Sequence, residues 1–259
     1  MRMMKKVLGT VTVLALSVSL LAGCGSTAAS PVSSAASTAA ESTTSSVASE
    51  TTSAAADEHA AAAAQLLNDL TGSYQELWPV ILADEYQQTW LDDCTALVGE
   101  ENAEAAFEKL SSMVTGDVYG EDAVKAYANG GGAYFCGFTN DLATLTFDGE
   151  TSTISGTDKD GNVLFSHTYH YIGMEPVRGL YEFESDDADS GEFTYFFLAP
   201  DTSAETYHIE FRYGSDADAL SQYDAGDYAY WLASGISTDC DQTMIDNCIE
   251  LFCTENLAG

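Results

Sequence analysis

Basic residues are scarce in this chain of 259 residues. It has 8 lysines and arginines against 41 aspartates and glutamates, which gives a formal net charge of −33 at pH 7. So few cations cannot neutralise the phosphates of nucleic acid or hold a protein by charge on anionic lipid. The composition therefore argues against a nucleic-acid-binding protein. It predicts a solvated acidic surface, which can also attract cations.

Recognisable catalytic motifs are also missing from the sequence. It contains no nucleophile elbow, no glycine-rich phosphate loop and no His-Glu-x-x-His sequence. Carboxylates are so numerous that no pair stands out as a general acid and base. The four histidines are the scarce residues that could carry chemistry. We therefore expect a binding protein and not an enzyme.

The first 24 residues have the pattern of a lipoprotein signal. Three basic residues precede an apolar stretch at 7–21, which is too short to be a convincing membrane span. The stretch ends in Leu21-Ala22-Gly23-Cys24, which resembles the lipobox of bacterial lipoproteins. We expect residues 1–23 to be a signal peptide and Cys24 to carry the lipid. The mature chain would then be anchored to the cell membrane on its extracytoplasmic face.

Serine, threonine and alanine dominate the next segment, residues 24–56. It lacks aromatic residues and apolar periodicity, so it cannot bury enough surface to offset its conformational entropy. We expect a disordered tether that touches the membrane only through the lipid. The remaining residues, 57–259, suffice for one domain with a hydrophobic core.

Beyond Cys24 the chain has an odd number of cysteines, so at least one thiol stays unpaired within a monomer. An exported chain can form disulfides. The spacing lacks the Cys-x-x-Cys pattern of a zinc knuckle, and it does not reveal the pairing. The five cysteines are Cys94, Cys136, Cys240, Cys248 and Cys253.

Hydrophobic periodicity divides the domain into a helical lead, a run of strands and a helical end. Helical spacing predicts helices at 59–69, 73–83, 85–98, 101–114 and 120–128, and again at 216–223 and 239–253. Period-two alternation predicts strands at 134–138, 143–147, 151–156, 163–172, 179–183, 192–198 and 205–213. Turn residues such as Asp148-Gly149 and Asp160-Gly161 separate these strands. Consecutive strands with short turns predict an α+β fold with an antiparallel up-and-down β-barrel.

The histidine pattern offers candidate metal ligands. His208 and Glu210 are two apart on a predicted strand, so both side chains project to the same face and could bind one metal ion. Alternatively, Arg212 on the same face pairs with Glu210, and this is simply the solvated side of the strand. His167 and His170 point to opposite faces, and either can equally be a hydrogen-bonded barrel residue.

Several motifs, in order over roughly residues 66–255, resemble the ZinT (YodA) family of periplasmic or surface zinc-binding proteins. The same domain is fused to some zinc-receptor lipoproteins of Gram-positive bacteria. The motifs that carry the resemblance are 70–79, 121–127, Tyr169-His170-Tyr171-Ile172-Gly173, 178–184, Leu198-Ala199-Pro200 and His208-Ile209-Glu210-Phe211-Arg212-Tyr213-Gly214. The resemblance implies a calycin- or lipocalin-like barrel with N-terminal helices and a C-terminal helix. It also implies zinc, or another divalent cation, as ligand, a role in metal homeostasis, and a metal ABC transporter as a possible partner.

The chain departs from the family pattern at the implied metal site. Phe196 stands where the family has a first histidine, and His208-x-Glu210 replaces a His-x-His pair. The family's histidine-rich loop is missing. We therefore expect a partly degenerate zinc site made by His208 and Glu210, with His167 as a third ligand. The alternative is a calycin-like module that binds a small apolar ligand or a partner protein without metal, because Phe196 makes the barrel mouth more apolar.

Overall fold

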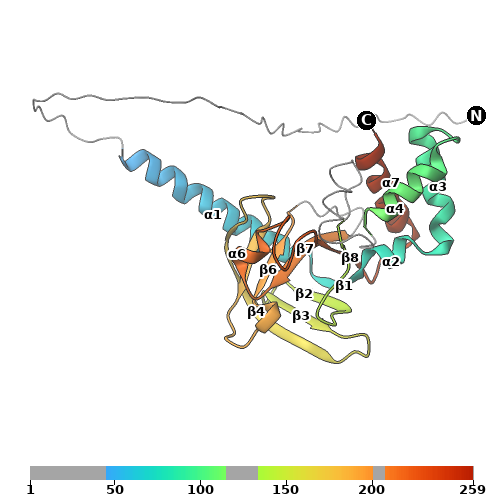
Figure 1. The fold of residues 1–259 in the computed structure, drawn as a ribbon. Coiled ribbons are helices and arrows are strands. Elements are labelled where there is room, and N and C mark those ends of the chain that lie inside the picture. The colour runs from blue at the N-terminus through green and yellow to red at the C-terminus, as the bar shows by residue number, and fades with distance from the viewer. Residues whose placement is uncertain (1–44, 115–133, 201–207, 259) are drawn as a thin grey trace, which may run out of the picture. The chain divides into compact units, whose positions relative to one another are not determined.

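Eight antiparallel strands form a closed barrel in the order β1 to β8, in which β1 pairs with both β2 and β8 (Figure 1). This computed structural model describes residues 45–114, 134–200 and 208–258, with side chains from residue 57 onward. All of them belong to one unit, Thr44–Gly259. The strands are β1 (Gly72–Glu76), β2 (Thr144–Asp148), β3 (Thr153–Thr157), β4 (Val163–Met174), β5 (Tyr181–Ser185), β6 (Tyr195–Leu198), β7 (His208–Gly214) and β8 (Ala233–Ser237).

Helices precede, interrupt and follow the strands. They are α1 (Ser45–Asp69), α2 (Leu77–Ile81), α3 (Gln87–Val98), α4 (Ala103–Ser112), α6 (Ala217–Leu220) and α7 (Gln242–Leu257), with short 3₁₀ helices η1 (Asp84–Tyr86) and η2 (Gly191–Phe193). The side chain of Asp241 caps α7 by accepting a hydrogen bond from the backbone N–H of Met244. No helix in the described ranges is long and apolar enough to cross a membrane.

Aromatic side chains fill the barrel interior. Alternate residues of each strand point inward, so Phe183, Phe196 and Phe211 meet there and are at most 1% exposed. Apolar residues of α1, including Leu66 and Leu67, belong to the same core. A packed interior of this kind stabilises the fold through apolar burial.

A second core lies outside the barrel, where α2, α3, α4 and α7 pack together and against the outer face of β8. Trp90 of α3 is completely buried there, and its indole N–H donates a 2.7 Å hydrogen bond to the carbonyl of Ile81. Phe252 of α7 packs edge-on against Trp78 and Trp90. Figure 1 shows α3, α4 and α7 side by side. The helical layer therefore fixes α7 beside the outer wall of the barrel.

The predicted fold class, an α+β antiparallel barrel flanked by helices, is confirmed. The predicted helix at 73–83 is wrong, because its first part is β1 and its second part is the short α2. Pro79 explains the division: proline is tolerated only in the first turn of a helix, and α2 begins at Leu77, two residues before it. The strand β1 is also what closes the barrel.

The strand β8 was not predicted. Its sequence, Ala-Ser-Gly-Ile-Ser, lacks alternation because the barrel interior buries one face and the helical layer buries the other. The predicted strand at 134–138 is reduced to a single bridge between Phe135 and Trp231. The other predicted strands occur with boundaries shifted by a few residues, and η2 occupies the start of 192–198.

The helix α1 begins at Ser45, inside the segment expected to be part of the tether. Alanine has the highest helix propensity, so an alanine-rich run extends a helix readily. The predicted helix at 120–128 and the first residues of the strand at 205–213 lie outside the described ranges.

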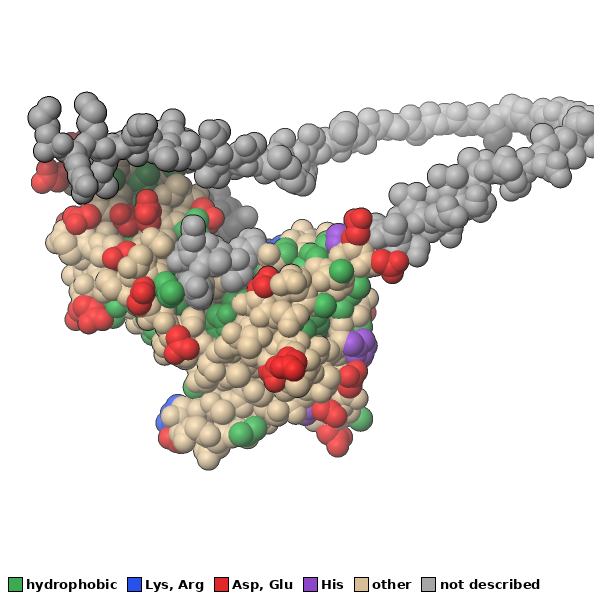
Figure 2. Space-filling model, turned by 180° about the vertical axis from the view of Figure 1, so that it is seen from behind, with side chains coloured by type: hydrophobic (Ala, Val, Ile, Leu, Met, Phe, Trp, Pro, Cys, Tyr) green, Lys and Arg blue, Asp and Glu red, His purple; other side chains and the backbone are tan. Residues whose placement is uncertain are grey.

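Acidic side chains are scattered over one face of the described residues (Figure 2). Figure 2 shows them spread over the visible face, on which lysines and arginines are sparse. On this face they are dispersed (Figure 2), as expected for a solvated acidic surface.

Candidate metal-binding site

His208 and Glu210 point away from the barrel interior. Their neighbours Ile209 and Phe211 are buried inside the barrel, so the alternating residues of β7 face outward. On that side His208 and Glu210 line a small pocket of about 70 Å³. The other residues that line it are Leu77, Trp78, Cys248, Leu251, Phe252 and Glu255. The pocket is therefore bounded by β7 on one side and by α2 and α7 on the other.

Four of these side chains carry atoms that bind metal ions. An imidazole comes from His208, carboxylates come from Glu210 and Glu255, and a thiol comes from Cys248. Zinc accepts nitrogen, oxygen and sulfur ligands of these types. Cys248 and Glu255 were not predicted as ligands from the sequence, because nothing in their spacing relates a C-terminal helix to a strand some forty residues earlier in the chain.

The thiol of Cys248 is protonated at neutral pH. Its pKa is raised to about 12, mainly by burial and to a smaller extent by the nearby Cys240, Glu255 and Glu210. A cation in the pocket would oppose both effects, because it stabilises the thiolate. Metal binding by Cys248 would therefore release a proton.

These groups do not form a finished coordination shell. Within the described ranges no three His, Cys, Asp or Glu side chains are close enough together to hold a metal ion. The donor types suit zinc, but their spacing requires α7 and β7 side chains to move before they can coordinate the same ion. The pocket is thus a set of candidate ligands and not a preformed metal centre.

His167 lies elsewhere in the barrel. It is on the inner face of β4, beside Phe165, and its side chain is 17% exposed. Its Nδ1 atom is 2.8 Å from a carboxylate oxygen of Asp187. Since β5 and β6 separate β4 from β7, the structure brings His208 and Glu210 together and places His167 apart from them.

His170 lies on the opposite face of β4 from His167, as the period of two predicts. Its side chain is about half exposed, and its Nδ1 atom is 2.7 Å from a carboxylate oxygen of Asp186. Each histidine of this strand is therefore held by its own aspartate.

Phe196 is part of the barrel core. It is fully buried and packs against the rings of Phe211 and Tyr213, with ring centroids 6.4 and 5.3 Å apart. Its pairing with Tyr213 on β7 confirms that it faces inward. A side chain at this position therefore lies on the other side of the barrel wall from His208 and Glu210.

Arg212 is held by backbone carbonyl groups. Although it shares the outer face of β7, it is completely buried and donates hydrogen bonds to the carbonyl oxygens of Leu220 and Tyr228. Its guanidinium also lies 4.3 Å from the centre of the Tyr223 ring. The segment after β7 thus folds over Arg212, which anchors it to the barrel.

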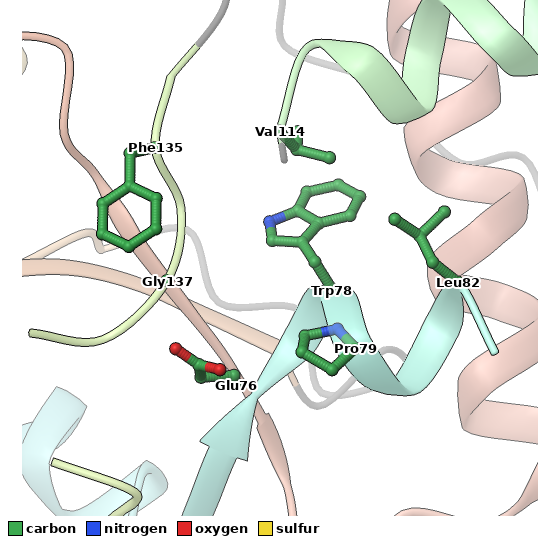
Figure 3. Close-up of a pocket in the computed structure, with 7 residues that line it drawn as sticks. All are labelled: Glu76, Trp78, Pro79, Leu82, Val114, Phe135 and Gly137. Carbon is green, nitrogen blue, oxygen red and sulfur yellow. The ribbon is translucent and has the colours of Figure 1, made fainter. Parts of the chain in front are cut away.

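A second, larger cavity of about 340 Å³ lies next to the first, and Trp78 lines both. In Figure 3 the rings of Trp78 and Phe135 lie on opposite sides of the space, and the Glu76 carboxylate points toward it. One oxygen of Glu76 accepts a 2.6 Å hydrogen bond from the backbone N–H of Phe138. The other lining residues are Pro79, Leu82, Val114 and Gly137, so the cavity is mainly apolar.

The strand pairing and the pocket define the class of this protein: a closed eight-stranded antiparallel barrel with a helical outer layer and potential metal ligands between them. No protein-family model matches the sequence, and no curated protein matches it. The barrel itself is assigned from the strand pairing.

Two solved structures are similar to this chain at low identity. The first is the Zn(II)-bound ZinT-like domain of AdcA from Streptococcus pneumoniae, with 15% identity and a TM-score of 0.45 over 71% of this chain and 89% of that domain. The second is Zn(II)-bound AdcA from the same organism, with 15% identity and a TM-score of 0.41 over 74% of this chain. The match spans 35% of that longer chain.

Proposed function

We propose that this protein binds a divalent metal ion in the pocket between β7 and α7, and that zinc is the first candidate. The observation that carries the proposal is the convergence of His208 and Glu210 with Cys248 and Glu255 on this one pocket. The histidine and the carboxylates are borderline and hard donors that suit zinc, and a thiolate would add a strong fourth ligand. The motif resemblance to the ZinT family and the acidic composition support the same function.

The pocket would bind metal by a small closure. His208 and Glu210 lie on β7, in the wall of the barrel, and Cys248 and Glu255 lie on α7. An ion that binds all four would draw the helix and the strand together. Such a site binds more weakly than a preformed one, because part of the binding energy is used to order it. His167 is not part of this proposal, since it lies inside the barrel and is bonded to Asp187.

The lipid at Cys24 would place this site outside the cell membrane. A protein there meets metal ions before they reach the cytoplasm, and a metal ABC transporter is the partner that this position suggests. The protein would act by binding and scavenging and not by catalysis.

Calorimetric titration with zinc tests the proposal. The chain would be made without residues 1–23 and with Cys24→Ser, so that lipid does not interfere. His208→Ala and Glu210→Gln should each weaken zinc binding by roughly tenfold or more. The matched control is His170→Ala, which removes an exposed histidine outside the pocket. No zinc binding by the parent chain, or equal losses in all three variants, would refute the proposal.

The 340 Å³ cavity favours a second candidate function, which is binding of a small apolar molecule. The ligand would lie between Trp78 and Phe135 and not inside the barrel, because aromatic side chains fill the barrel core. Trp78 fluorescence would report such binding, and Phe135→Ala should weaken it. Apolar probes that leave the tryptophan emission unchanged would argue against this function.

A further inference from the structure

Two cysteines meet in the helical core. Cys94 of α3 and Cys253 of α7 are both completely buried, and their sulfur atoms are 4.0 Å apart. They are separated by 159 positions in the sequence, and strands β2 to β8 lie between them along the chain. The two helices that carry them pack directly against each other.

We propose that Cys94 and Cys253 form a disulfide that fastens α7 to α3. A disulfide has a sulfur–sulfur bond of about 2.05 Å, so the two atoms need to approach by about 2 Å. Side-chain rotation and a small shift of one helix can supply this movement. Export to an oxidising compartment, which the lipobox predicts, is the condition under which such bonds persist.

The other cysteines have different surroundings. Cys248 is on the same helix as Cys253 but lines the pocket that faces β7. Cys136 lies beside the strands, where its thiol donates toward the carbonyl oxygen of Tyr134 over 3.6 Å. Cys240 precedes α7 and is only partly buried. The proposed bond therefore pairs the two thiols that point into the contact between α3 and α7.

Oxidation needs an external disulfide, such as glutathione disulfide or the active-site disulfide of a thiol oxidase. The thiolate of one cysteine attacks that disulfide, forms a mixed disulfide and releases one thiolate of the reagent. The thiolate of the second cysteine then attacks the protein sulfur of the mixed disulfide and releases the other reagent thiolate. The two protons lost by the cysteines end on the two reagent thiols, so two protein thiols are oxidised and one reagent disulfide is reduced.

The burial of both sulfurs determines when the bond can form. Both thiols are completely buried, so an external disulfide cannot reach them in the closed helical layer. Oxidation therefore proceeds before α7 has docked or while it is transiently loosened from α3. Once formed, the bond limits how far α7 can move from the wall that carries His208 and Glu210.

Peptide mapping of the signal-less Cys24→Ser chain tests the proposal. The protein is oxidised with glutathione disulfide during refolding, denatured, alkylated and digested without reduction. We expect Cys94 and Cys253 to be found in one linked peptide pair. Free, alkylated Cys94, or Cys94 linked to any other cysteine, would overturn the proposal. This test needs no substitution in the helical core and no metal, so its outcome is independent of the zinc titration.

Thermal unfolding gives a second readout. Reductant should lower the Tm of the oxidised protein by roughly 5 to 15 °C, because the bond closes a long loop in the unfolded chain. The matched control Cys248→Ala should keep this shift, whereas Cys253→Ala should abolish it. A shift that survives in Cys253→Ala would show that another disulfide causes it.

Discussion

Replacing Phe196 with histidine separates two accounts of the metal site. The sequence resemblance implies that Phe196→His would restore a missing zinc ligand. The structure predicts the opposite, because Phe196 faces the barrel interior and the pocket lies outside the wall. We expect zinc affinity to stay within about twofold of the parent protein, a change of less than about 0.5 kcal/mol.

The same substitution should destabilise the barrel. Phe196 is 0% exposed and packs against Phe211 and Tyr213. An imidazole is smaller and leaves a polar ring nitrogen buried without a partner, at a cost of about 1–3 kcal/mol for the unmet hydrogen bond. Adding the lost apolar contacts gives a total of about 3 kcal/mol, or a Tm lowered by about 6–12 °C for a domain of this size.

Thermal unfolding followed by circular dichroism measures the loss, with Phe196→Leu as the control. Leucine keeps the site apolar and should lower the stability by only about 1 kcal/mol. The reasoning would be refuted if Phe196→His unfolded at the parent temperature and bound zinc at least tenfold more tightly. That result would mean that the side chain at this position reaches the metal.

Three further predictions concern stability and pH. Removing the cap of α7 with Asp241→Ala should lower the stability by about 1 kcal/mol in urea unfolding, and an unchanged midpoint would contradict the capping role. Arg212→Met should lower the stability by at least about 2 kcal/mol, because buried carbonyl groups lose their donors; a neutral effect would show that water replaces the guanidinium. Burial raises the pKa of Cys136 and Cys248 from 9.0 to about 12. The stability that these neutral thiols contribute is complete below about pH 9 and is lost as the pH rises toward 12. Cys248→Ala should therefore reduce the loss of stability between pH 9 and 12, measured by unfolding at a series of pH values. An unchanged pH profile would contradict this prediction.

The sequence predicted the fold class because most strands have one face in the barrel core and one face outside. In β2 and β3 this arrangement produces the alternation that identifies a strand. The prediction from alternation failed for β8, because β8 is covered on both faces. It also failed for β1, because Tyr74 has a helical spacing with Trp78 and Ile81. Both of these strands are needed to close the barrel.

The candidate site was only half predictable. The spacing of His208 and Glu210 predicted a shared face, and the structure places both in one pocket. Cys248 and Glu255 could not be related to them, because the contact between β7 and α7 depends on tertiary packing. The same limit applies to Cys94 and Cys253, which lie far apart in the chain and meet only through the packing of α3 against α7.

The zinc content of the purified protein tests the central claim most directly. The chain from residue 24, with Cys24→Ser, would be dialysed to equilibrium against a fixed concentration of free zinc, and the zinc in excess of the dialysis buffer would be measured by elemental analysis beside the double variant His208→Ala, Glu210→Gln. We predict about one zinc ion per chain in the parent protein and close to none in the double variant, provided that both have the same circular dichroism spectrum. A parent protein without zinc, or equal zinc in a folded double variant, would contradict the claim that the pocket between β7 and α7 is the metal-binding site.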